Sequence, residues 1–265
     1  MLIKDIISEI ETFAPLSLQE DYDNAGLIIG NPATDITATL LTLDVTEDVI
    51  DEAIRKNCQL IVAHHPLIFS GIKQLNGSDE VQRCVVKAIK SDIAIYAAHT
   101  NIDNVINGVS GRMAEKIGLQ NIEILKAISS SCEDFQNRVG AGVVGNLPQP
   151  VSEQEFLQKL KSIFGTGCIK HTQLQNKPIR KVALCGGSGS AFLKEAINVQ
   201  ADVYVSADFK YHDFFNAENQ ILIADIGHYE SEVFTKEIFY EIITKKISTF
   251  AVQISETNTN PIKYF

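Results

Sequence analysis

Two adjacent histidines, His64 and His65, follow a short apolar run in the sequence IVAHHPLIF at residues 61–69. The run at residues 60–62 has the composition of a buried strand, and parallel sheets carry their chemistry at the carboxyl ends of their strands. Successive side chains of a strand point to opposite faces, so neighbouring histidines share a site only where the strand has ended or where each binds a different ion. Pro66 favours an extended chain at His65. The pattern indicates one wall of a metal centre with two ions, and the plainer alternative is a pair of exposed loop histidines.

A second polar cluster follows another apolar run, residues 93–98, and contains His99 and Asp103. Alternating strands and helices build parallel sheets whose strands end at one common edge. We therefore expect His99 and Asp103 to lie near His64 and His65. Asp44 ends a further apolar segment at residues 36–45, and a carboxylate there could orient a ligand histidine.

His228 and Glu232 form a third cluster, four residues apart at the start of a helix expected to continue to about residue 242. Their side chains share one helix face, so together they could bind a divalent transition metal, and the carboxylate could bridge two ions. Such a pair is more often a surface contact. The apolar strand before it, residues 221–224, and the need of His64 and His65 for further ligands favour the metal site.

Two features of the second half leave alternatives open. His212 follows a predicted strand at residues 202–206 and, like His99, is a candidate for acid–base catalysis or for a structural hydrogen bond. The glycine-rich residues 186–190 follow a predicted strand at residues 181–185 and could offer backbone amides to a phosphate. Their spacing matches neither a dinucleotide fingerprint nor a Walker loop, and a tight turn without a ligand is an equal alternative.

The elements that position these residues alternate between strand and helix. Apolar periodicity predicts helices at residues 2–13, 79–90, 109–117 and 152–163. The serine-rich segment 129–131 interrupts the alternation, and a strand follows from residue 138. We predict an α/β protein of two α/β domains with mainly parallel sheets, and a metal site at the strand carboxyl ends in the cleft between them. The metal-binding domain would comprise residues 1–128 with 226–265, and the second domain residues 129–225.

Composition limits the classes of protein that fit. The five cysteines, at positions 58, 84, 132, 168 and 185, form no close pairs, which argues against a disulfide framework or a zinc knuckle. No apolar run approaches the roughly 20 residues of a membrane helix, and the first helix lacks the plan of a signal peptide, so we expect a cytoplasmic protein. The net charge of −10 disfavours nucleic acid as a partner.

Six motifs extend over nearly the whole chain: DNAGLIIG from Asp23, AHHPLIF from Ala63, AHTNID from Ala98, CGGSG from Cys185, DFKYHD from Asp208 and GHYESE from Gly227. With them the sequence resembles the NGG-one-interacting-factor-three-like family, whose members are also called type 2 GTP cyclohydrolase I homologues or dinuclear metal centre hexameric proteins. The resemblance implies a toroidal homohexamer of two-domain subunits. It also implies a two-ion site formed by His64, His65, Asp103, His228 and Glu232.

Residues and resemblance together lead us to expect a dinuclear-metal-dependent hydrolase, similar to the type 2 GTP cyclohydrolase I homologues. Its substrate would be a nucleotide or a related heterocyclic or phosphorylated small molecule. Two divalent ions would activate a water molecule, and mixed histidine and carboxylate ligands suit zinc, iron or manganese. The alternative is a non-catalytic protein, either a metal-binding ring scaffold or a protein that binds a regulatory partner.

Overall fold

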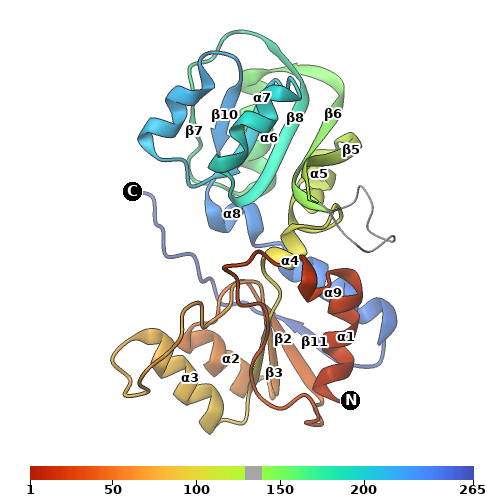
Figure 1. The fold of residues 1–265 in the computed structure, drawn as a ribbon, viewed down its shortest axis with the longest axis vertical. Coiled ribbons are helices and arrows are strands. Elements are labelled where there is room, and N and C mark those ends of the chain that lie inside the picture. The colour runs from red at the N-terminus through yellow and green to blue at the C-terminus, as the bar shows by residue number, and fades with distance from the viewer. Residues whose placement is uncertain (129–138) are drawn as a thin grey trace. The chain divides into compact units, whose positions relative to one another are not determined.

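The computed structural model describes residues 1–128 and 139–265 (Figure 1). The predicted serine-rich connector at 129–131 and the expected start of a strand at 138 lie outside the described residues. The chain divides into two compact units: unit 1 is Met1–Ile102 with Thr235–Pro261, and unit 2 is Asp103–Phe234 with Ile262–Phe265.

The boundaries between the compact units lie at residues 102/103, 234/235 and 261/262, whereas the sequence pattern predicts domain boundaries near 128/129 and 225/226. The first difference arises because α5 (Val109–Ile117) and β5 (Gln120–Ala127) pack with the sheet of unit 2. The second arises because α8 (His228–Glu232) also belongs to unit 2. The domain assignment itself stays a prediction.

Unit 1 is built on a five-stranded sheet with the strand order β1-β4-β3-β2-β11. Strands β4 (Ala94–Ala97), β3 (Leu60–Ala63), β2 (Ala38–Thr42) and β11 (Ala251–Ile254) are parallel, and β1 (Gly26–Ile29) is antiparallel to β4. Helices α2 (Glu47–Arg55) and α3 (Glu80–Lys90) cover one face, and α1 (Ile3–Phe13) and α9 (Thr235–Lys246) cover the other (Figure 1). Both faces are buried, which explains why the central strands read as continuous apolar runs.

Unit 2 contains a six-stranded sheet with the strand order β5-β6-β8-β9-β10-β7. Its central strands β8 (Pro178–Ser188), β9 (Val203–Ala207) and β10 (Leu222–Asp225) are parallel. The outer strands β6 (Gly140–Ser152) and β7 (Lys170–His171) are antiparallel to their central neighbours, and β5 is antiparallel to β6. Helices α5 and α6 (Glu153–Phe164) pack on one face, while α7 (Leu193–Asn198) and the 3-10 helix η4 (Tyr211–Ala217) pack on the other.

The predicted α/β class is confirmed, and three details of the prediction differ. The strand expected at 181–185 extends through Ser188, so the first glycines of the 186–190 segment continue β8 rather than forming a turn. The helix expected to run from 228 to about 242 is interrupted between α8 and α9. Strand β5 was not predicted. Among the described residues, none of the helices combines the length and the apolar composition needed to cross a membrane.

Candidate metal centre

Three histidines meet at the carboxyl ends of neighbouring strands of unit 1. His64 and His65 follow β3, and His99 follows β4. Each offers a ring nitrogen, and these three atoms lie within 4.8 Å of one another. Their ring centroids are separated by 4.9 Å for His64 and His65, 5.3 Å for His64 and His99, and 5.5 Å for His65 and His99. The parallel pairing of β3 and β4 thus brings two separate motifs to one place.

The Nδ1 atom of each imidazole lies against an oxygen acceptor. His64 Nδ1 is 2.9 Å from the Ala98 carbonyl, His65 Nδ1 is 2.6 Å from Asp44, and His99 Nδ1 is 2.8 Å from Asp23. A carbonyl oxygen only accepts hydrogen bonds, so Nδ1 of His64 carries the proton and its lone pair is on Nε2. Metal-binding histidines commonly donate their second ring N–H to a carboxylate or carbonyl in this way, because the bond fixes the tautomer and the ring orientation.

The two aspartates of this cluster are held as carboxylates. Burial raises the pKa of Asp44, but the hydrogen bond and charge of His65, together with the hydrogen bond from Thr259, outweigh it and lower the pKa below its ordinary value. Burial also raises the pKa of Asp23, but hydrogen bonds from His99 and Thr100 outweigh it and hold the pKa well below that of a typical aspartate. The expected hydrogen bond between Asp44 and a histidine is confirmed.

A second donor group lies in unit 2. In α8, His228 Nε2 is 3.0 Å from Glu232 Oε2, which confirms that the two side chains share a face, and His228 Nδ1 is 2.7 Å from Asp208 Oδ2. Burial lowers the pKa of His228, but the two carboxylates outweigh it and raise the pKa to about 11. The imidazole is therefore protonated between two carboxylates when no metal is bound, and the position between Nε2 and Glu232 suits a cation.

The glycines of the CGGSG motif pack closely behind Glu232. Gly187 has φ +61°, and a Cβ atom there would lie 2.0 Å from Glu232 Oε1. Its amide also donates to Ser231 Oγ at 2.9 Å. A Cβ on Gly189 would lie 2.2 Å from Ser206 Oγ. The glycines therefore have a packing role at α8, and a phosphate-binding role for residues 186–190 stays a prediction.

Cys185 and Asp103 belong to the same region of unit 2. Burial raises the pKa of the Cys185 thiol to about 12, helped by the charges of Asp103 and Glu232. The Cys185 thiol therefore stays protonated in the metal-free protein and offers no thiolate to a metal. Asp103 closes α4 (Thr100–Asp103), and its Oδ1 atom is buried. One carboxylate oxygen of Asp103 lies within 4.8 Å of one of Glu232.

The two histidines predicted to take part in catalysis have different surroundings. His99 lies with His64 and His65, as the strand-end argument expected. His212 is an exposed residue of η4. Its ring centroid lies 5.1 Å from that of Tyr211 and 6.1 Å from that of Phe215. Sequence reasoning missed Asp23 and Asp208 as partners of His99 and His228, although both stand in motifs that it had singled out, DNAGLIIG and DFKYHD.

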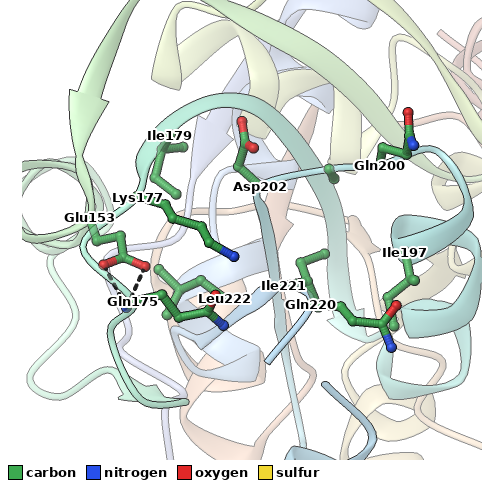
Figure 2. A pocket seen from close by; sticks show the side chains of 11 residues that line it. Glu153, Gln175, Lys177, Ile179, Ile197, Gln200, Asp202, Gln220, Ile221 and Leu222 are labelled. Atoms are coloured by element: carbon green, nitrogen blue, oxygen red, sulfur yellow. Dashed lines mark hydrogen bonds between the residues drawn. The ribbon is translucent and has the colours of Figure 1, made fainter. Parts of the chain in front are cut away.

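A separate pocket of about 280 Å³ lies at the amino ends of the central strands of unit 2. Figure 2 shows three residues around it, Ile179 and Leu222 at the starts of β8 and β10 and Asp202 directly before β9. It also shows the carboxylate of Glu153 accepting the backbone N–H of Gln175. His228 and Glu232 follow the carboxyl end of β10, so this pocket lies at the opposite end of the strand. It is not part of the candidate centre.

Comparison with known proteins finds chains similar to this one in sequence and in fold. The model of the Duf34/NIF3 (NGG1p interacting factor 3) family matches residues 1–261. A protein of Clostridium acetobutylicum named GTP cyclohydrolase 1 type 2 homolog is 32% identical over 269 residues, covering 99% of this chain and 98% of that protein. A Streptococcus pneumoniae protein of the same name is 34% identical over 272 residues, covering all of both chains.

Solved structures agree with the sequence comparison. The crystal structure of a Bacillus cereus protein related to NIF3 has a TM-score of 0.90 at 25% identity, covering 100% of this chain and 99% of that chain. Reduced HcgD from Methanocaldococcus jannaschii has a TM-score of 0.79 at 28% identity, covering 97% and 98%. The match of the family model over nearly all residues, with relatives above 30% identity over the full length, shows that this chain belongs to the Duf34/NIF3 family.

Proposed function

We propose that this protein is a dinuclear-metal-dependent hydrolase of a nucleotide or a related heterocyclic or phosphorylated small molecule. Its ligands would be His64, His65, Asp103, His228 and Glu232, and they would hold two zinc, iron or manganese ions. The observation that carries the proposal is the group of three imidazoles in unit 1, each with its Nδ1 atom against an oxygen acceptor. Imidazole and carboxylate donors together suit these metals better than calcium.

The chain's own residues supply orientation and proton transfer. When bound, two ions would activate a water molecule and stabilise the negative charge that develops on the substrate. Asp23 holds the Nδ1–H of His99, so Nε2 of His99 is the atom that accepts a proton from the attacking water or returns one to the leaving group. Asp44 and Asp208 hold His65 and His228 in the same manner. An acid–base role for His212 remains a prediction.

The names of the relatives support a reaction on a nucleotide, since several are called GTP cyclohydrolase 1 type 2 homolog. The family description, NGG1p interacting factor 3, favours the second candidate, a non-catalytic metal-binding ring scaffold that binds a regulatory protein. We also propose, from the family resemblance, a cytoplasmic homohexamer with a toroidal shape. Light scattering on the purified protein would test the hexamer directly.

A metal analysis followed by a substrate panel tests the proposed function. Protein purified without a metal-affinity tag should contain up to two transition-metal ions per chain by elemental analysis. The metal-loaded protein would then be incubated with GTP, other nucleotides, dinucleotides and phosphate esters, beside His65→Ala and Asp103→Ala variants. His171→Ala is the matched control, because His171 is an exposed histidine of unit 2 whose Nδ1 contacts the Thr172 carbonyl. Turnover that survives both ligand variants would place the activity elsewhere, and metal binding without any turnover would favour the scaffold.

A further inference from the structure

Two exposed aromatic rings stand beside the histidines of unit 1. Tyr22 is 65% exposed and Phe69 is 51% exposed, although large apolar side chains are costly to leave in water. Their ring centroids are 6.3 Å apart. Phe69 also meets His99 edge to face, with a centroid separation of 6.1 Å and an interplanar angle of 78°. The aromatic surface thus continues into the three-histidine group.

The loops that carry the two rings are joined to each other and to the histidines. Asn24 Nδ2 donates to the Ile68 carbonyl at 2.6 Å, which ties the loop of Tyr22 to the loop of Phe69. Asp23, the neighbour of Tyr22, holds His99 Nδ1 with one oxygen and the Thr100 amide with the other. The loop that carries Tyr22 therefore also carries the aspartate that orients His99.

The charges around Tyr22 indicate which part of a ligand the rings would contact. The acidic residues Glu20 and Asp21 precede Tyr22 in the sequence and make this loop unfavourable for a phosphate group, while the carboxylate of Asp23 is already paired with His99 and Thr100. Flat aromatic faces next to such a loop suit an uncharged planar ring, which stacks on aromatic side chains without depending on a particular base.

We propose that Tyr22 and Phe69 form the surface that binds the planar heterocycle of the substrate, with the ring of a nucleobase as the chemical class. The inference rests on the proposed function and deepens it, because it assigns the recognition of the ring to two residues that bind no metal. It concerns binding alone, so it can be tested without turnover.

The chain contains no tryptophan, which allows a single reporter to be introduced. Tyr22→Trp places an indole at the proposed surface, and guanosine added to the metal-free variant should quench its fluorescence with saturation. Phe69→Leu in the same background should weaken guanosine binding about tenfold, since one stacked ring is lost. Ribose 5-phosphate, which lacks the base, should not displace guanosine. Tyr240→Trp is the control, because Tyr240 is an exposed aromatic residue of α9 in the same unit.

Three results of the binding experiment would overturn the inference: quenching of equal strength in Tyr22→Trp and Tyr240→Trp, affinity unchanged by Phe69→Leu, or no saturable quenching. Light scattering on Tyr22→Leu and Phe69→Leu tests the alternative that the two rings form a contact between copies of the chain. If either change lowers the assembly state, the aromatic surface is a contact between copies of the chain and the inference is wrong. Guanosine binding without turnover of any nucleotide would support binding of the base by Tyr22 and Phe69 and would contradict the hydrolase proposal.

Discussion

Asp44 accepts the Nδ1–H of His65 at 2.6 Å with one carboxylate oxygen, and its other oxygen accepts the hydroxyl of Thr259 at 2.5 Å. The three residues come from segments far apart in the chain: the end of β2, the end of β3 and the carboxy-terminal segment. The carboxylate therefore links a candidate metal ligand to a residue near the end of the chain. This relationship leads to the first two predictions.

Replacing Asp44 by alanine should lower metal affinity about 10–100-fold without removing a ligand, because His65 loses the partner that fixes its ring. Competition with a chromogenic chelator measures the affinity, and circular dichroism checks the fold. Asp51→Ala is the matched control, since Asp51 pairs with Lys87 at 2.6 Å in the same unit but away from the histidines. An unchanged affinity in Asp44→Ala would contradict the orienting role.

Thr259→Val should lower metal affinity by a smaller factor than Asp44→Ala, because only the hydroxyl that steadies Asp44 is lost. Thr259→Ser keeps the hydroxyl and should retain the wild-type affinity. If serine and valine behave alike, the hydroxyl of Thr259 does not support the centre.

A change at Gly187 should disturb the centre through Glu232. In Gly187→Ala the new Cβ would meet Glu232 Oε1 at 2.0 Å, so the carboxylate must move. The matched control is Gly165→Ala. Gly165 has nearly the same backbone angle, φ +62° against +61° for Gly187, but a Cβ there would have no neighbour within 4 Å. Both variants should lose about 1–2 kcal/mol of stability to the left-handed backbone, while only Gly187→Ala should lose metal affinity. Equal metal affinities in the two variants would refute the coupling to Glu232.

The grouping of the three strand-end histidines could be predicted from the sequence. His64, His65 and His99 could be brought together from the order of strands alone, because parallel strands end at one edge of a sheet. The pairing of His228 with Glu232 followed from helical spacing. Asp23 and Asp208 could not be assigned as partners, because the loops that carry them reach His99 and His228 only in the tertiary structure.

The missing elements also have physical causes. Strand β5 is an edge strand in which Leu125 is the one buried residue, so its sequence shows little of the alternation that reveals a strand. Gly186 and Gly187 were read as a turn because glycine usually marks one. In the folded chain they lie in β8, where an added Cβ would meet Val109 or Glu232.

Removing metal with a chelator should leave the fold intact. Each unit has a buried apolar core built from a sheet with helices on both faces, unlike a zinc finger, whose folding depends on its ion. Thermal unfolding of chelator-treated protein should therefore stay cooperative, with a lower midpoint because bound ions stabilise the folded state. Loss of the cooperative transition in chelator would contradict this expectation.

Acid unfolding of metal-free protein should depend on Glu52, which is buried in unit 1. Burial raises its pKa, but Lys56, Ser255, Thr257 and the Glu256 amide outweigh this and lower it from 4.5 to about 2. A carboxyl whose pKa is lower in the folded chain stabilises the protein above pH 4.5, and this stabilisation is lost as the pH falls from 4.5 toward 2. The lowering of the Glu52 pKa from 4.5 to about 2 corresponds to about 3 kcal/mol of folding stability. In urea titrations, Glu52→Gln should be less stable than wild type at pH 7, and the gap should close toward pH 2; a gap independent of pH would refute the assignment.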